Sequence, residues 1–102
     1  MRMTGAWAAI GFSIGLVTSP AIAADAGYGA RLANACTSCH GLEGRSLGEV
    51  PSLAGRHADE LIAQLRAFKS GDVEATIMNR LARGYSDEEI VALAAYFSGV
   101  AP

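Results

Sequence analysis

The chain is predicted to fold as a small all-α domain of three main helices. Residues 28–39, residues 59–70 and the residues that follow Ser86 each carry apolar residues at helical spacing or a helix-start signal. No stretch shows the strict alternation of apolar and polar residues that is typical of a strand. Residues 41–55 are rich in Gly, Ser and Pro and are therefore predicted to be a loop.

The first 23 residues are predicted to be a secretory signal peptide rather than part of this domain. Arg2 supplies a positive charge, the apolar run Ala6–Val17 follows it, and Ala21-Ile22-Ala23 has the A-x-A pattern of a cleavage site. The run is shorter than the roughly 20 residues that span a membrane. Residues 24–102 are thus expected to form an exported domain without a membrane span; an uncleaved N-terminal anchor is the alternative.

The predicted mature chain is small and mildly acidic. Removing residues 1–23 from 102 leaves about 79 residues, which are few for a self-sufficient apolar core. A bound group that serves as part of the core would solve this problem. Loss of Arg2 takes the formal net charge from −2 to −3. Because no basic excess remains, no binding to nucleic acid is expected.

Apolar spacing predicts the first two helices. Residues 28–39 carry Leu32 and Ala35 on one side, and Gly41 follows the end of this helix. Residues 59–70 are followed by Gly71, a typical residue just past a helix end. This second helix has apolar residues at i, i+4 and i+7 with one more beside them: Leu61, Leu65 and Phe68, with Ile62.

A capping box predicts the last helix. Ser86 is followed three residues later by Glu89, the pattern in which two side chains satisfy the first backbone N–H groups of a helix. Gly99 is expected to end this helix. Residues 74–84, which lie before it, are ambiguous and are predicted as no more than a broken helical turn. The apolar face of the last helix consists of Ile90, Leu93, Ala94 and Phe97.

The segment Cys36-Thr37-Ser38-Cys39-His40 carries the most specific chemistry. It has the form C-x-x-C-H, the attachment signature for a c-type haem, in which two thiols add to two vinyl groups of a porphyrin and the adjacent imidazole binds the iron. A thioredoxin-like pair would need a βαβ pattern, a zinc site would need further ligands, and a structural disulfide would leave His40 unexplained. One covalently attached haem c, with its iron, is therefore the expected cofactor.

The second ligand of the iron is a choice between Met78 and His57. Methionine and histidine are the common partners in electron-transfer haems, and these two residues are the remaining candidates after removal of residues 1–23. Met78 lies between two predicted helices, where a loop can bring its sulfur to the iron, whereas the ring of His57 is expected to face solvent. Met78 is the favoured ligand; His57 and an open or water-bound site are the alternatives.

These motifs together resemble class I cytochromes c over about residues 27–99. The motif C-x-x-C-H matches the attachment site of that family, and Pro51-Ser52-Leu53-Ala54-Gly55 matches its P-x-L-x-G loop. The resemblance implies a class I cytochrome c fold wrapped round the haem, in which the Pro51 carbonyl accepts a hydrogen bond from His40 and Leu53 packs on the porphyrin. It also implies that the first helix crosses the last, through Tyr28, Leu32, Leu93 and Tyr96.

Residues 64–71 and 76–89 resemble the cytochrome subunit of flavocytochrome c sulfide dehydrogenase. This resemblance implies a periplasmic single-haem protein that carries one electron at a time between redox proteins, as a subunit that accepts electrons from a sulfide-oxidising flavoprotein and is no enzyme on its own. The alternatives are a freestanding carrier that serves a terminal oxidase or another acceptor, and a ligand-binding catalytic haem. Arg80 and Arg83 flank Met78 and would suit an acidic partner surface, or would only keep the segment soluble.

Overall fold

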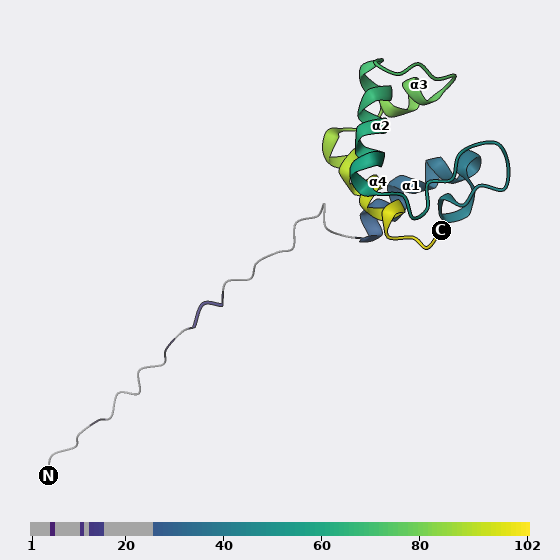
Figure 1. Cartoon of the computed structure of the whole chain (residues 1–102). Coiled ribbons are helices and arrows are strands. Elements are labelled where there is room, and N and C mark those ends of the chain that lie inside the picture. The colour runs from purple at the N-terminus through teal and green to yellow at the C-terminus, as the bar shows by residue number, and fades with distance from the viewer. Residues whose placement is uncertain (1–4, 6–10, 12, 16–25) are drawn as a thin grey trace, which may run out of the picture.

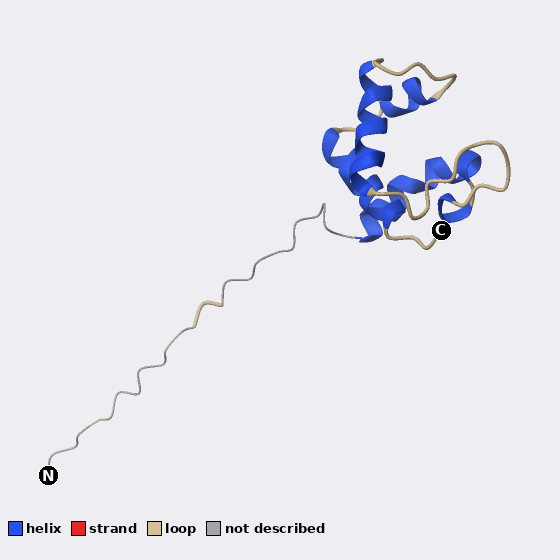
Figure 2. Cartoon of the chain, viewed as in Figure 1, coloured by secondary structure: helices blue, strands red, loops and turns tan. Residues whose placement is uncertain are grey.

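The computed structural model describes residues 5, 11, 13–15 and 26–102, and every regular element in them is helical (Figures 1 and 2). None of the described helices is long and apolar enough to cross a bilayer. The predicted all-α class is confirmed, whereas most of the predicted signal peptide lies outside the described residues. The elements are α1 (Ala26–His40), the 3₁₀ helix η2 (Leu42–Gly44), α2 (Ala58–Ser70), α3 (Met78–Ala82) and α4 (Asp87–Ser98).

The first and last helices cross in close contact. At the crossing, a Cβ atom on Gly29 would lie 2.9 Å from the carbonyl oxygen of Ala92 and 3.0 Å from Cβ of Tyr96. Only glycine therefore fits there unless one helix moves. Ala33, one turn further along α1, is 1% exposed, whereas Ala35 is exposed. The buried face of α1 thus follows Gly29 and Ala33.

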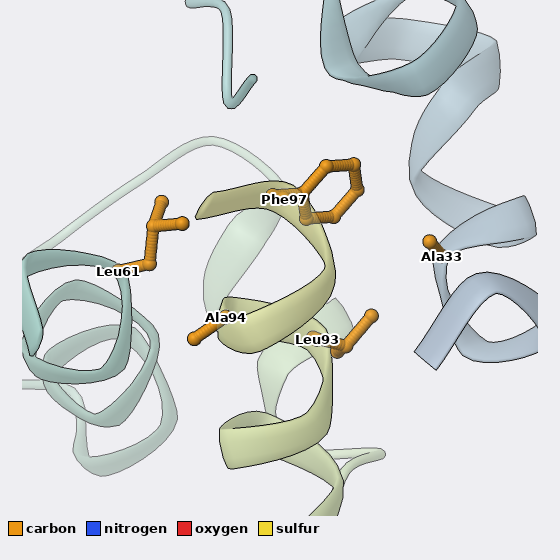
Figure 3. Packing of buried hydrophobic residues seen from close by; sticks show 5 residues of the cluster. All are labelled: Ala33, Leu61, Leu93, Ala94 and Phe97. Atoms are coloured by element: carbon orange, nitrogen blue, oxygen red, sulfur yellow. The ribbon is translucent and has the colours of Figure 1, made fainter. Parts of the chain in front are cut away.

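The centre of the hydrophobic core is α4, which packs against both α1 and α2. In Figure 3, residues of α4 stand between Leu61 of α2 and Ala33 of α1. Five of the nine buried hydrophobic residues among those described are alanine, and the largest fully buried side chains are those of Ile90 and Leu93. This is a thin core for a folded domain. The predicted buried face of α4 is confirmed at all its positions, each no more than 2% exposed: Ile90, Leu93, Ala94 and Phe97.

Local signals set the ends of two helices. At the start of α4, the Ser86 hydroxyl accepts a hydrogen bond from Glu89 N–H at 3.1 Å, and the Glu89 carboxylate accepts one from Ser86 N–H at 2.9 Å. The predicted capping box is confirmed. At the end of α2, Gly71 adopts the left-handed conformation, with φ of 86°, as expected for a residue just past a helix. The first helix is longer than predicted and includes His40.

One short helix, α3, lies within residues 74–84, which were ambiguous in the sequence and were predicted as a broken helical turn. Its five residues begin at Met78, so this residue starts a helix instead of lying in a loop. A helix this short is not stable by itself. It forms here because it packs against α2 and because Ala82 is fully buried. The cause is tertiary contact, which is why the sequence around Met78 was ambiguous.

Candidate functional site

An apolar cavity of about 390 Å³ opens between α1, α2 and α3. This volume falls within the range of roughly 300–1,000 Å³ that is typical of ligand pockets. In Figure 1, α3 and the C-terminal part of α1 lie on opposite sides of the opening. The apolar lining residues come from both sides and from α2 and α4: Ala35, Val50, Pro51, Leu53, Leu61, Leu65, Phe68, Ile77, Met78, Leu81, Leu93, Ala94 and Phe97.

Both cysteines line this cavity from the end of α1. Residues three apart on a helix lie nearly one turn apart, so Cys36 and Cys39 share a side. No disulfide joins them. Among the described residues no cluster of three or more His, Cys, Asp or Glu side chains could hold a metal ion. A zinc site would need ligands besides the two cysteines, and the described residues do not supply such a cluster.

The environment of Cys36 does not suit a redox-active dithiol. Burial raises the pKa of the Cys36 thiol, and this effect outweighs the hydrogen bond with Tyr85, which lowers it. The C-terminal end of a helix carries the negative end of the helix dipole, which also disfavours a thiolate. Reactive dithiols need a lowered thiol pKa. The Cys36 thiol is therefore poorly suited to disulfide exchange, which leaves the attachment of a bound group as the better interpretation of this residue.

His40 is the last residue of α1, and its ring orientation is set by the loop before α2. Its Nδ1 lies 2.6 Å from the carbonyl oxygen of Pro51. A carbonyl oxygen can only accept, so Nδ1 carries the proton and donates it to this bond. In the neutral ring, Nε2 then keeps a lone pair that can bind a metal. The loop itself is anchored, because Leu53 N–H donates to the carbonyl oxygen of Gly44 at 2.8 Å.

Met78 brings a thioether to the cavity from the start of α3, where it is half-buried. His57, by contrast, is exposed at the N-cap of α2 and does not line the cavity. The structure thus brings together all of the residues that were predicted to bind the haem and leaves His57 outside. Those residues are Cys36, Cys39, His40, Pro51, Leu53 and Met78.

Three polar lining residues were not predicted from the sequence: Arg56, Gln64 and Tyr85. Arg56 forms an ion pair with Glu60, and no carboxylate of the described residues lines the cavity. A guanidinium at the edge of an apolar cavity suits the carboxylates of a porphyrin. The signal that could have found Arg56 is its position directly after the loop Pro51–Gly55. Gln64 lies eight residues after Arg56, on α2.

The donor set fits a covalently attached iron porphyrin. Two thiols from one helical turn, an imidazole held in the metal-binding tautomer, and a thioether all meet within apolar walls. These are the groups that attach a c-type haem and ligate its iron. An all-α domain that closes on such a cavity is a c-type haem domain.

Comparisons with known proteins agree with this class. The family model described as Cytochrome c matches residues 26–101. The chain belongs to the cytochrome c family, and its cofactor is a covalently bound haem c with iron. In the solved structures, cytochrome c4 of Acidithiobacillus ferrooxidans superposes with a TM-score of 0.72 at 32% identity, covering 76% of this chain and 50% of that one. The predicted class I cytochrome fold is confirmed.

Two relatives differ in how much of their length this chain spans. The cytochrome subunit of sulfide dehydrogenase from Chlorobaculum tepidum is 38% identical over 69 residues, which cover 68% of this chain and 63% of that protein. Cytochrome c-554(548) of Halomonas halodenitrificans is 36% identical over 80 residues, which cover 74% of this chain and 96% of that protein. The chain therefore spans less than two thirds of the first relative and nearly all of the second.

Proposed function

We propose that this chain is a single-haem electron carrier that moves one electron at a time between redox proteins and is no enzyme on its own. The observation that carries the proposal is the meeting of His40 and Met78 in one apolar cavity. If both residues bound the iron, the protein would leave no position on it for a substrate. Haem c, when bound, supplies one-electron redox chemistry.

Each site residue has a separate role in this proposal. Cys36 and Cys39 hold the porphyrin, and Leu53 shields it from water. The hydrogen bond from His40 to Pro51 orients the imidazole and raises its basicity as a ligand. The thioether of Met78 favours ferrous iron and gives a higher potential than a second imidazole would.

Optical spectra test this proposal directly. A pyridine haemochrome assay should report covalent c-type haem, and the ferric protein should show the weak long-wavelength band of thioether bound to iron. The ferrous protein should bind carbon monoxide poorly because Met78 occupies the iron. Ready binding of carbon monoxide would contradict the proposal and favour a ligand-binding or catalytic haem.

The partner proposed first is a sulfide-oxidising flavoprotein in the periplasm. Support comes from the 38% identity to the cytochrome subunit of sulfide dehydrogenase and from the predicted signal peptide. Purification of the native protein should recover a flavin in stoichiometric amount, and N-terminal sequencing should find a chain that begins at Ala24 or Asp25. A full-length N-terminus would point to an uncleaved anchor instead.

A freestanding diffusible carrier is the second candidate, supported by relatives that the match covers over most of their length. The chain covers 96% of cytochrome c-554(548) and 87% of cytochrome c-553 from Nitratidesulfovibrio vulgaris, which is 36% identical. In this case the protein purifies without flavin and passes electrons to a terminal oxidase or another acceptor. Arg80 and Arg83, both exposed beside Met78, would then steer an acidic partner. Electron transfer that slows as salt rises would support this steering.

A further inference from the structure

Asn79, the residue after Met78, ties α3 to two other segments through its side chain. Its Nδ2 donates to the carbonyl oxygen of Phe68 at 2.9 Å and to that of Val73 at 2.7 Å. Its Oδ1 accepts from the N–H of Ala75 at 2.7 Å. These bonds use three of the four positions at which an amide side chain can bond.

The backbone groups that bond to Asn79 lie where regular secondary structure does not supply them with good hydrogen-bond partners. Phe68 lies in the last turn of α2, where carbonyl groups lack a partner within the helix. Its other backbone partner, Gly71 N–H, lies at 3.3 Å, which is a longer bond. Val73 and Ala75 lie in the connection between α2 and α3. One side chain thus joins the end of α2, this connection and the start of α3.

The start of α3 has few other contacts to hold it. The N-cap residue, Ile77, makes no side-chain capping bond. Ala82, at the opposite end of the helix from Met78, is the residue of α3 that is buried against the rest of the chain, whereas Ile77 and Leu81 line the cavity that the haem would fill. The position of Met78 relative to the cavity therefore depends strongly on the hydrogen bonds of its neighbour, Asn79.

We propose that Asn79 is a positioning residue, which holds Met78 at the cavity and so keeps its thioether on the iron. The inference depends on the proposed function, in which Met78 is the distal ligand. Loss of the three hydrogen bonds would leave the folded domain intact but would raise the fraction of molecules in which Met78 is off the iron. A roughly tenfold rise corresponds to about 1.4 kcal/mol, which is within the contribution of three such bonds.

The test uses the ferric holoprotein and imidazole, which binds only when Met78 leaves the iron. Asn79→Ala should bind imidazole roughly tenfold more tightly than the wild type and should show a weaker thioether–iron band, with covalent haem unchanged in the haemochrome assay. Asn79→Asp keeps an acceptor for Ala75 N–H but loses both donors and sets a carboxylate against two carbonyl groups. It should therefore bind imidazole at least as tightly as Asn79→Ala does.

Two control variants separate positioning from stability. Asn34→Ala makes the same truncation at an exposed site on α1. Ser86→Ala removes the capping box of α4 and lowers global stability without touching Asn79. Both controls should keep the wild-type imidazole affinity.

Three results would overturn the inference. The first is that Asn79→Ala binds imidazole with the wild-type affinity. The second is that Ser86→Ala gains as much imidazole affinity as Asn79→Ala does, because the effect would then come from lower stability alone. In both cases a normal wild-type spectrum would leave the proposed function standing. A wild-type protein without the thioether–iron band would overturn the ligation by Met78, and this inference with it.

Discussion

The two sides of the haem cavity are held by different kinds of interaction. The side that carries His40 is built on the crossing of α1 and α4, where Gly29 lies against Ala92 and the buried core begins. The side that carries Met78 is a five-residue helix that is secured by one buried alanine and by the polar side chain of Asn79. We call these the His40 side and the Met78 side.

This difference predicts an order of opening. A segment opens locally at low cost when it buries little apolar surface, and at a cost near that of global unfolding when it is part of the core. The His40 side shares the buried face of α4, whereas α3 buries only Ala82 against the rest of the chain, and Ile77 and Leu81 face the cavity that the haem would fill. The Met78 side should therefore open first, with the haem still attached and His40 still bound.

The largest effect is expected on the His40 side, when the attachment of the haem is removed. Cys36→Ala or Cys39→Ala should weaken or abolish covalent haem retention, and the double variant should leave a largely unfolded chain. The reason is that the core is thin and the domain has no other covalent staple among the described residues. Haemochrome assays and circular dichroism would measure both effects. A double variant that is haem-free and well folded would contradict the assignment.

The next effect should fall on the Met78 side and change the redox properties more than the fold. Met78→Ala should erase the thioether–iron band, lower the potential and admit carbon monoxide. Met78→His should keep the iron six-coordinate at a lower potential, because imidazole stabilises ferric iron better than a thioether does. Potentiometric titration and carbon monoxide binding would measure these changes. His57→Ala is the control, because His57 is exposed and lies outside the cavity. The reduction potential of this variant should match that of the wild type.

The comparison also explains which features could be predicted from the sequence. The capping box of Ser86 and Glu89 is local, and the apolar face of α4 repeats at helical spacing, so both are visible in the chain. The attachment motif is likewise contiguous. The hydrogen bond between His40 and Pro51 spans 11 residues, and it was expected only because the loop resembles that of class I cytochromes c.

The remaining features depend on contacts between distant segments. The resemblance implied that the first helix crosses the last, but no signal near Gly29 in the chain indicated that Gly29 itself lies against Ala92. The side chain of Asn79 reaches back 11 residues to Phe68, and the short helix that begins at Met78 forms only because of such contacts. The Met78 side was therefore harder to predict from the sequence. Its structure depends on a few contacts with distant segments, which is also why it should open more easily.

Gly29→Ala tests the packing that supports the His40 side. The added methyl group would meet backbone atoms of α4 at 2.9 Å, so the two helices must separate. Overpacking of this kind costs about 1–3 kcal/mol. Denaturant unfolding of the holoprotein should show this loss, with no change in potential if the ligands stay bound. Gly48→Ala is the matched control, because a Cβ at Gly48 meets nothing within 4 Å; an equal loss in both variants would refute the close-packing argument.

The smallest effect is expected from Ser86→Ala, which removes one half of the capping box at the start of α4. Loss of a Ser cap costs about 1 kcal/mol, and in a domain of this size that lowers the melting temperature by about 4–8 °C. Since α4 is the centre of the core, the loss should appear in global unfolding while the thioether–iron band persists at temperatures below the transition. Ser86→Thr keeps the hydroxyl and should retain most of the stability. The opposite outcome is that the thioether–iron band of Ser86→Ala fades at temperatures well below the unfolding transition. The start of α4 would then open together with the Met78 side rather than with the His40 side.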